Sequence, residues 1–205
     1  LLKHLTVAIV GVGGSGKTTY SILSAYVAML LVGLSRERAM AAVARNTFFE
    51  PLEFVEYVKS LVSEERWVPF IILDDVGAQI SKYWMHIGQR YWAHLFSVLD
   101  HLKDWCGVLI MTARAFESIP ARLRELADYV VEASESRLPS GAVLDVFKFY
   151  TYSDYARWRR RRAGLLYVDV LPPSVKMPKE LWNRMLEVRK KTGLARLAEI
   201  EAELR

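Results

Sequence analysis

Short runs of β-branched and other apolar residues recur along the first two thirds of the chain, separated by longer segments with apolar residues at helical spacing. The runs at Leu5–Val10, Val68–Leu73 and 107–111 are typical of strands buried on both faces of a sheet. Strands that alternate with helices predict a mostly parallel sheet covered by helices on both faces. The predicted helices lie at 18–32, 36–45, 51–63, 84–105 and 120–128.

Two shorter apolar runs, 47–49 and 129–132, bring the predicted strands to five. A Pro-Ser-Gly turn then leads into residues 143–152, where two sets of side chains alternate as in a hairpin strand, and residues 178–204 have helical spacing. The predicted fold class is therefore α/β, a three-layer domain with a mostly parallel five-stranded central sheet, plus a C-terminal hairpin and a helical basic tail. We expect a core at residues 1–135 and, on the same domain, an appendage at residues 136–205.

The composition excludes several classes of protein. With 52% hydrophobic and 25% charged residues, the chain is not disordered. No uninterrupted apolar stretch reaches the roughly eighteen residues of a membrane span, so we expect no membrane partner. The single cysteine, Cys106, excludes a disulfide framework and a thiolate metal site. Because no segment has the order of a signal peptide either, we expect a reducing, cytoplasmic location.

Charge is distributed unevenly along the chain. The net charge is +5, yet residues 1–150 hold 15 basic and 16 acidic side chains, whereas residues 151–205 hold 13 and 7. A near-neutral body with a basic last quarter is typical of a protein whose tail meets a polyanion, with nucleic acid as the first candidate. A solvated helical tail is the alternative interpretation of the same charges.

A glycine-rich segment, residues 11–18, matches the pattern G-x-x-x-x-G-K-[ST] between a predicted buried strand and a predicted helix. Glycines allow backbone N–H groups to turn toward phosphate oxygens, and the positive end of the helix dipole points to the same place. Lys17 would bridge the β- and γ-phosphates, and the Thr18 hydroxyl would bind Mg²⁺. The segment also spells G-x-G-x-x-G, but the adjacent Lys17 and Thr18 favour ATP over a dinucleotide. The predicted nucleotide-binding residues are Gly11, Val12, Gly13, Gly14, Ser15, Gly16, Lys17, Thr18 and Thr19.

Two acids, Asp74 and Asp75, follow the predicted strand Val68–Leu73. Parallel neighbouring strands bring their carboxyl ends to one edge of the sheet, where ligands bind. Asp74 would hold Mg²⁺ through water, and Asp75 would orient or deprotonate the attacking water. The pair favours hydrolysis over phosphate transfer to a metabolite, with two solvated carboxylates in a turn as the alternative.

The phosphate loop, the acid pair and a third strand ending in Thr112 occur in the order found in the additional-strand class of P-loop ATPases, which residues 5–133 resemble. Within that class the chain resembles AAA+ proteins of the DnaA, DnaC and IstB kind. Residues 74–77, 166–172 and 189–191 are similar to stretches of small DnaA-like ATPases of archaeal viruses and plasmids. The resemblance implies a DNA-associated ATPase that works as a homo-oligomer.

The resemblance also implies a polar sensor and an arginine finger. Thr112 occupies the position that reads the γ-phosphate in this class, although a strand-terminal threonine can instead satisfy a backbone group. A finger supplied in trans stabilises charge on the nucleotide of a neighbouring subunit. Arg122 and Arg124 lie where the family carries its finger, Arg122 being slightly preferred, and Arg114 is a further candidate. Surface ion pairs are the alternative role of these arginines.

A basic aromatic segment, residues 150–162, combines three tyrosines, one tryptophan and five arginines. Arginine binds phosphate oxygens and aromatic rings stack on bases, so the segment predicts DNA binding, with RNA as another partner to consider. Alternatively, Tyr150, Tyr152 and Trp158 pack on the sheet while the arginines face water or pair with acids. The predicted DNA-binding residues are Arg157, Trp158, Arg159, Arg160, Arg161 and Arg162.

The chain departs from the AAA+ pattern after the fifth predicted strand, where that family places a helical lid. A hairpin, the basic segment and one long helix follow instead, with Arg184 and Arg189 as candidate lid substitutes. We predict a Mg²⁺-dependent ATPase coupled to DNA binding or remodelling, in replication initiation or helicase loading for a virus- or plasmid-like element, with a replication or packaging protein as partner. Two alternatives stay open: an FtsK/HerA-type translocating or genome-packaging ATPase, and a slow nucleotide-dependent switch that organises protein partners.

Overall fold

The computed structural model describes residues 4–77, 89–158, 164–171, 178–183, 185–187 and 190, with the side chains of 51, 89–96, 157 and 158 left out. The chain divides into two compact units, Leu1–Val175 and Lys176–Arg205. The second unit is helical at 179–183, 185–187 and 190. The rest of the predicted helix at 178–204 lies outside the described residues.

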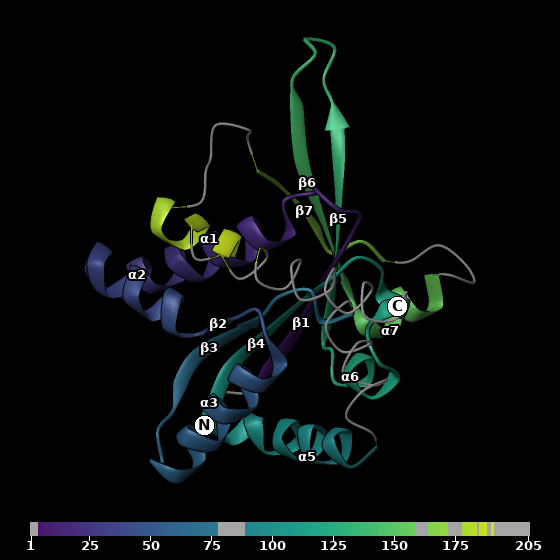
Figure 1. Cartoon of the computed structure of the whole chain (residues 1–205). Helices are drawn as coiled ribbons and strands as arrows, with labels where there is room; N and C mark the ends of the chain where they lie inside the picture. The colour runs from purple at the N-terminus through teal and green to yellow at the C-terminus, as the bar shows by residue number, and fades with distance from the viewer. Residues whose placement is uncertain are drawn as a thin grey trace, which may run out of the picture. The chain divides into compact units, whose positions relative to one another are not determined.

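The first unit is built on one mixed sheet, which has seven strands among the described residues (Figure 1). Their order across the sheet is β2-β3-β4-β1-β5-β6-β7. The first five in this order are parallel, whereas β6 runs antiparallel to β5 and β7 antiparallel to β6. The strands are β1 (Leu5–Val10), β2 (Thr47–Phe48), β3 (Val68–Leu73), β4 (Cys106–Ala113), β5 (Tyr129–Arg137), β6 (Val143–Thr151) and β7 (Tyr167–Leu171).

The prediction of a five-stranded sheet with an added hairpin was therefore wrong in one respect. Strand β5 continues past Glu132 to Arg137, through the expected boundary at residue 135, and β6 pairs with it along its whole length. Gly141, with φ of 83°, supplies the left-handed residue that reverses the chain between them. The hairpin and β7 thus extend the central sheet, and the tip of the hairpin projects beyond it (Figure 1).

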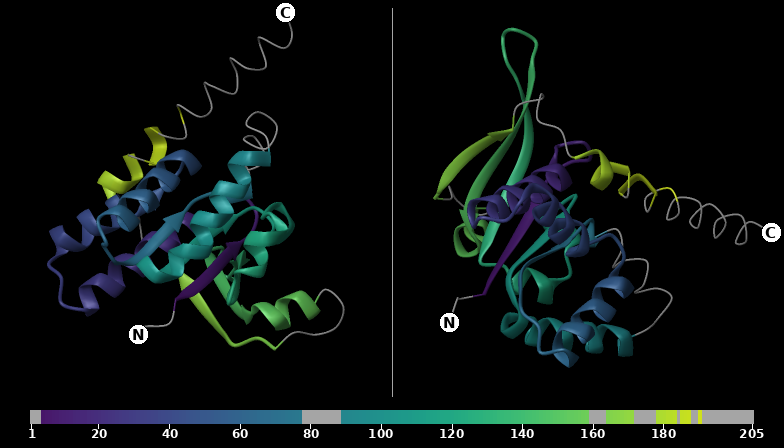
Figure 2. Two further views of the ribbon diagram at one scale, coloured as in Figure 1. Left: turned by 90° about the horizontal axis from the view of Figure 1, so that it is seen from below. Right: turned by 90° about the vertical axis from the view of Figure 1, so that its left-hand side faces the viewer.

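Helices cover both faces of this sheet, as predicted. Phe54 of α3, Leu102 of α5 and Leu123 of α6 are fully buried in the larger core cluster on one face. Helix α1 covers the other face, where Tyr20 packs against a second cluster that includes Phe147 (Figures 1 and 2). The helices are α1 (Lys17–Leu31), α2 (Arg36–Arg45), α3 (Pro51–Ser63), α5 (Gln89–Trp105), the short 3-10 helix η1 (Phe116–Ser118), α6 (Ala121–Glu125) and α7 (Tyr152–Trp158).

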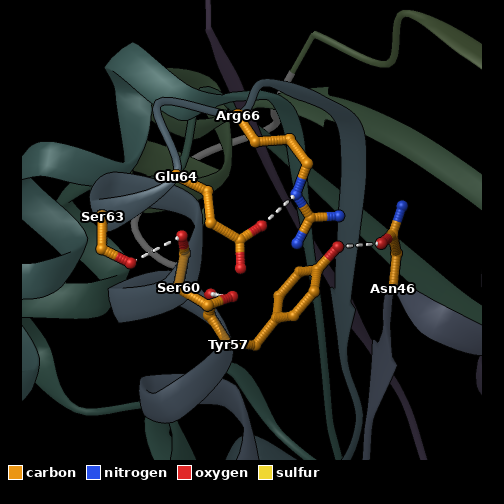
Figure 3. Close-up of polar contacts among 6 residues, drawn as sticks. All are labelled: Asn46, Tyr57, Ser60, Ser63, Glu64 and Arg66. Atoms are coloured by element: carbon orange, nitrogen blue, oxygen red, sulfur yellow. Dashed lines mark hydrogen bonds and ion pairs between the residues drawn. The ribbon is translucent and has the colours of Figure 1, made fainter.

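Polar contacts fix the β2 edge of the sheet (Figure 3). The Tyr57 hydroxyl of α3 donates a hydrogen bond to Oδ1 of Asn46 at 2.5 Å, and the Arg66 guanidinium lies 5.5 Å from the centre of the Tyr57 ring. Glu64 forms an ion pair with Nε of Arg66 at 3.0 Å. The Asn46 carbonyl in turn accepts the N–H of Ile72 at 2.8 Å. These contacts hold β3 in register just before the acids that follow it.

Candidate nucleotide site

The glycine-rich loop leaves the end of β1 and is held between two neighbouring strands. The Gly11 N–H donates to the carbonyl of Ala113, at the end of β4, with an N···O distance of 3.2 Å. On the other side, a Cβ on Gly11 would collide with the backbone carbonyl oxygen of Ala133 on β5. Gly11 is therefore needed for the close approach of β5, and the loop begins at a fixed point between β4 and β5.

The rest of the loop turns back on itself to open α1. Gly14 and Gly16 have φ of 88° and 72°, conformations that glycine adopts without steric cost. Ser15 is fully buried and its Oγ donates to the carbonyl of Val12 at 2.8 Å. Gly16 is the N-cap of α1, and no side chain caps the helix there. A helix N-terminus of this kind favours a bound anion such as phosphate.

Lys17 lies across the mouth of the loop. Its Nζ donates to the carbonyl oxygens of Gly11 and Val12 at 2.7 Å each, and it lies 3.4 Å from Oγ of Ser15. The ammonium group is thus held by the first half of the loop while the helix begins in the second half. Thr19 is half-buried in the first turn of α1. The ammonium group and the N-terminus of α1 thus belong to one loop, and both favour a bound phosphate.

The acids after β3 meet the threonines of the loop and of β4 at one atom. The hydroxyls of Thr18 and Thr112 both donate to Oδ1 of Asp74 at 2.7 Å. Asp74 is 2% exposed, so these hydrogen bonds stabilise a buried carboxylate. The Asp74 N–H also donates to the Phe48 carbonyl of β2 at 2.9 Å, which fixes the backbone. The structure therefore brings together residues from three separate segments, as the sequence predicts.

This cluster fits a magnesium ion. Adjacent ligands of an octahedral Mg²⁺ shell with bonds of about 2.0–2.1 Å lie roughly 2.9 Å apart. The Thr18 hydroxyl and the Asp74 carboxylate are already 2.7 Å apart, and both are oxygen ligands of the type that Mg²⁺ takes. Thr18 and Asp74 could hold the ion, directly or through water.

Asp75 has a strained backbone beside this cluster. Its φ is 49°, in the left-handed region that non-glycine residues seldom occupy, although aspartate tolerates it better than most. The backbone N–H donates to Oγ1 of Thr112 at 2.8 Å, so Thr112 connects both acids. Within the described part of the chain no hydrogen bond or ion pair holds the Asp75 carboxylate. Such a backbone conformation is common at functional sites.

The candidate finger arginines have other contacts within the chain. Arg122 forms an ion pair with Asp100 of α5 at 3.0 Å, with both side chains about half exposed. The Arg124 guanidinium lies 5.7 Å from the centre of the Phe116 ring, and Arg114 is exposed. A role in trans for any of these arginines stays a prediction.

The basic aromatic segment divides into two parts. Tyr150 is buried in the larger core cluster and Tyr152 packs against it, so the packing alternative holds for these two, and Tyr155 is buried there as well. Arg157 and Trp158 end α7, with their side chains outside the described residues, and Arg159, Arg160, Arg161 and Arg162 lie wholly outside them. The candidate lid residues Arg184 and Arg189 also lie outside. DNA binding by this segment stays a prediction.

Sequence reasoning missed the contacts that β6 and β7 make with α1. The Tyr20 hydroxyl donates to Oδ2 of Asp169 at 2.6 Å, and its ring stacks on Phe147 with centroids 3.8 Å apart. Burial, followed by the hydrogen bond to Asp169, raises the pKa of Tyr20 far above its ordinary value. Asp145 of β6 lies against Gly16 of the loop. The alternation in residues 143–152 put Asp145 on the same face as Phe147, which was the signal available in the sequence.

No helix among the described residues combines the length and the apolarity that a membrane crossing needs.

Comparison with known proteins gives a fold and a distant viral relative. No family model matches the chain. Over 105 residues, 51% of this chain and 41% of the other, it is 32% identical to the uncharacterized protein B-251 of Sulfolobus spindle-shape virus 1. The chain thus spans less than half the length of that protein.

Two solved structures are similar in part. The flagellar accessory protein FlaH from Methanocaldococcus jannaschii has a TM-score of 0.46 at 15% identity, over 74% of this chain and 80% of that one. The N-terminal domain of zonular occludens toxin from Neisseria meningitidis has a TM-score of 0.51 at 10% identity, over 88% and 98%. The second likeness concerns the fold alone. Together with the loop between β1 and α1 and the acids after β3, it gives this chain the fold of a P-loop NTPase.

Proposed function

We propose that this protein is a Mg²⁺-dependent ATPase whose hydrolysis is coupled to DNA. The observation that carries the first half is the convergence of Thr18, Asp74 and Thr112 on one carboxylate oxygen next to the loop. A solvated turn would leave these groups in water, whereas here a buried acid is held between the phosphate loop and the strand that bears the sensor position.

Each residue of the cluster has a distinct task in hydrolysis. Lys17 and the N-terminus of α1 bind phosphate oxygens, and Thr18 and Asp74 hold Mg²⁺, which supplies charge neutralisation for the transferring phosphoryl group. The Asp75 carboxylate orients the attacking water and accepts its proton. Thr112 keeps the two acids in place through its hydrogen bonds to Asp74 and to the Asp75 N–H.

Phosphate release from ATP with Mg²⁺ tests this assignment. The Asp75→Asn variant keeps the size of the side chain and removes the base, so we expect ATP binding with hydrolysis reduced by at least about 100-fold. An Asp75→Asn variant that hydrolyses ATP at the native rate would remove Asp75 from the reaction.

Coupling to DNA is supported by the charge distribution. The basic excess lies in residues 151–205, and arginines 159–162 follow directly on a short helix whose tyrosines are used in the core. We expect DNA to raise the rate of hydrolysis and binding to weaken steeply with salt. Neutralising Arg159, Arg160, Arg161 and Arg162 should flatten the salt dependence, while an unchanged slope and a rate indifferent to any DNA would remove the coupling.

Two roles fit a DNA-dependent ATPase, and they differ in what the enzyme does to the duplex. Replication initiation or helicase loading, the DnaA-like role, is supported by the sequence resemblance and by the similarity to a viral protein. Translocation or packaging, the FtsK/HerA-like role, is supported by the sheet, because the antiparallel β6 follows β5 directly where a helical lid would stand in AAA+ proteins. Strand separation at an origin indicates the first role, and movement along a long duplex the second.

A homo-oligomer with a finger in trans, from Arg122, Arg124 or Arg114, completes the proposal. Particle size with and without an ATP analogue and DNA tests it, because a finger in trans requires subunit contact. A replication or packaging protein is the expected further partner. A particle that stays monomeric under all these conditions, and hydrolyses slowly regardless of DNA, would favour the nucleotide-dependent switch.

A further inference from the structure

The carboxylate of Asp145 lies directly against the phosphate loop. Its Cγ is 2.9 Å from the position that a Cβ on Gly16 would occupy, and Oδ2 is closer still. Within the described part of the chain, Asp145 makes no hydrogen bond and no ion pair. The structure thus places a charged acceptor without a donor beside the residue that begins α1.

The direction of a bound nucleotide follows from the sheet order. Asp74, Asp75 and Thr112 mark the γ-phosphate end, and they follow β3 or end β4, on one side of β1. The loop itself follows β1, while β5 and β6 lie on the other side. A triphosphate that runs through the loop toward the acids must therefore leave its nucleoside end toward β5 and β6, where Asp145 lies.

Among the residues that the structure describes, the neighbouring strand supplies no hydrogen-bond donor to the Asp145 carboxylate. Glu135 is its partner in the antiparallel register of β5 and β6, so the nearest side chain across the hairpin carries the same charge. Burial, followed by this charge, raises the pKa of the Asp145 carboxyl above its ordinary value. The folded protein therefore holds this carboxylate against an unfavourable electrostatic environment, which is typical of functional residues rather than of structural ones.

The chemistry of a nucleotide selects the group that Asp145 can bind. Phosphate oxygens repel a carboxylate, whereas the sugar hydroxyls are donors and are the first donors along the molecule after the phosphates. Counted from the phosphates, the ribose precedes the base along the nucleotide, so its hydroxyls are the first donors that a carboxylate beside the loop would meet.

We propose that Asp145 accepts a hydrogen bond from the ribose hydroxyls of the bound nucleotide and so selects ribonucleoside triphosphates. This inference rests on the proposed function, because it concerns the same site. Asp145 is then a specificity residue on β6, outside the segments that carry the phosphate-binding motifs.

Binding of three compounds tests the proposal: ATP, 2′,3′-dideoxy-ATP and inorganic tripolyphosphate. We expect the native protein to prefer ATP over the dideoxy compound by about tenfold or more, since a hydrogen bond to a charged group is worth at least that factor. Asp145→Ala removes the acceptor and should lose most of this preference, and Asp145→Asn, whose amide oxygen is a weaker and uncharged acceptor, should keep only part of it; both should still bind tripolyphosphate. Glu135→Gln, which removes the neighbouring charge but not the acceptor, should keep the preference.

The outcomes separate the two proposals. A native protein that binds ATP and the dideoxy compound equally, or an Asp145→Ala variant that keeps the full preference, would overturn the role of Asp145 and leave the ATPase proposal intact. A native protein that binds neither ATP nor tripolyphosphate would overturn the proposed function and this inference with it.

Discussion

The acids on the two sides of β1, Asp74 and Asp145, differ in burial and in the donors that they receive. On the β3–β4 side, Asp74 is almost fully buried and receives two hydroxyl donors. On the β5–β6 side, Asp145 is half-buried, faces Glu135 and receives no donor from the described residues. The first side is arranged before any ligand arrives, whereas the second is left incomplete. The difference teaches that the protein itself supplies donors to the acid on the β3–β4 side, whereas the acid on the β5–β6 side has no donor among the described residues, as our proposal of a ribose contact requires.

The largest expected effect comes from the loop that joins the two sides. Lys17→Ala removes the ammonium group that bridges the first half of the loop and would bind phosphate, so we expect hydrolysis to fall by at least about 100-fold. Phosphate release measures the effect. The matched control is Lys103→Ala, an exposed lysine of α5, which should keep the native rate. Native hydrolysis by Lys17→Ala would refute the whole site assignment.

Thr112→Val tests whether the hydrogen bonds of Thr112 hold Asp74 and Asp75 in place. The change preserves shape but leaves the Asp75 N–H without its acceptor and Asp74 with one donor fewer, so we expect a loss of about 1–3 kcal/mol in the free energy of unfolding and slower hydrolysis. Thr47→Val is the control, because its buried hydroxyl donates only to the Val43 carbonyl among the described contacts. Denaturant unfolding and phosphate release should separate them: both variants lose stability, and only Thr112→Val loses rate.

Tyr20→Phe removes the hydrogen bond that joins α1 to Asp169 of β7. Loss of the hydrogen bond to the exposed Asp169 should cost about 1 kcal/mol of stability and reduce the protection of β7 amides against hydrogen exchange. Tyr57→Phe, which loses its bond to Asn46, should cost a similar amount and leave β7 unchanged. The pKa of Tyr20 is raised in the folded state. The stability that its neutral hydroxyl contributes is therefore complete below pH 10 and is lost as the pH rises above that value. Equal protection of β7 in both variants would show that Tyr20 does not hold it.

Asp145→Asn has the smallest expected effect on stability, and we expect it to stabilise the protein rather than to destabilise it. The pKa of Asp145 is raised in the folded state, so ionisation opposes folding once the pH exceeds the ordinary value of 3.8. We expect the variant to unfold at a slightly higher temperature than the native protein near pH 7 and at the same temperature near pH 3. Calorimetry at both values checks this; a variant that is less stable near pH 7 would contradict it.

Sequence patterns predict the parallel strands and their order much better than the antiparallel strands. The strands β1, β3 and β4 are continuous apolar runs, and Lys17, Thr18, Asp74 and Asp75 stand in short motifs at their ends, so local pattern and topology suffice to place them together. The role of β6 depends on which strand it pairs with. Alternation alone predicts a strand but does not say that it continues the central sheet, and β7 is only five residues long.

Contacts between distant segments account for what the sequence could not show. Tyr20 follows the phosphate motif directly, yet its partner Asp169 lies 149 positions away. The tyrosines of the basic aromatic segment have the composition of a base-stacking surface, but burial in the core decides their role. Neither outcome follows from residue type or spacing, because each depends on how the hairpin returns to the sheet.

The contacts at Gly11 and Gly16 also differ in how a substitution at each glycine could be compensated. At Gly11 the obstacle to a side chain is the backbone carbonyl of Ala133, which no substitution can remove. At Gly16 the obstacle is the side chain of Asp145, and what then remains is the modest backbone strain of an alanine at positive φ. We therefore expect Asp145→Ala to relieve part of a defect caused by Gly16→Ala, and no side-chain change at Ala133 to relieve one caused by Gly11→Ala. The loop thus contains one glycine whose neighbour is fixed backbone and one whose neighbour is a replaceable side chain on a strand more than a hundred residues away.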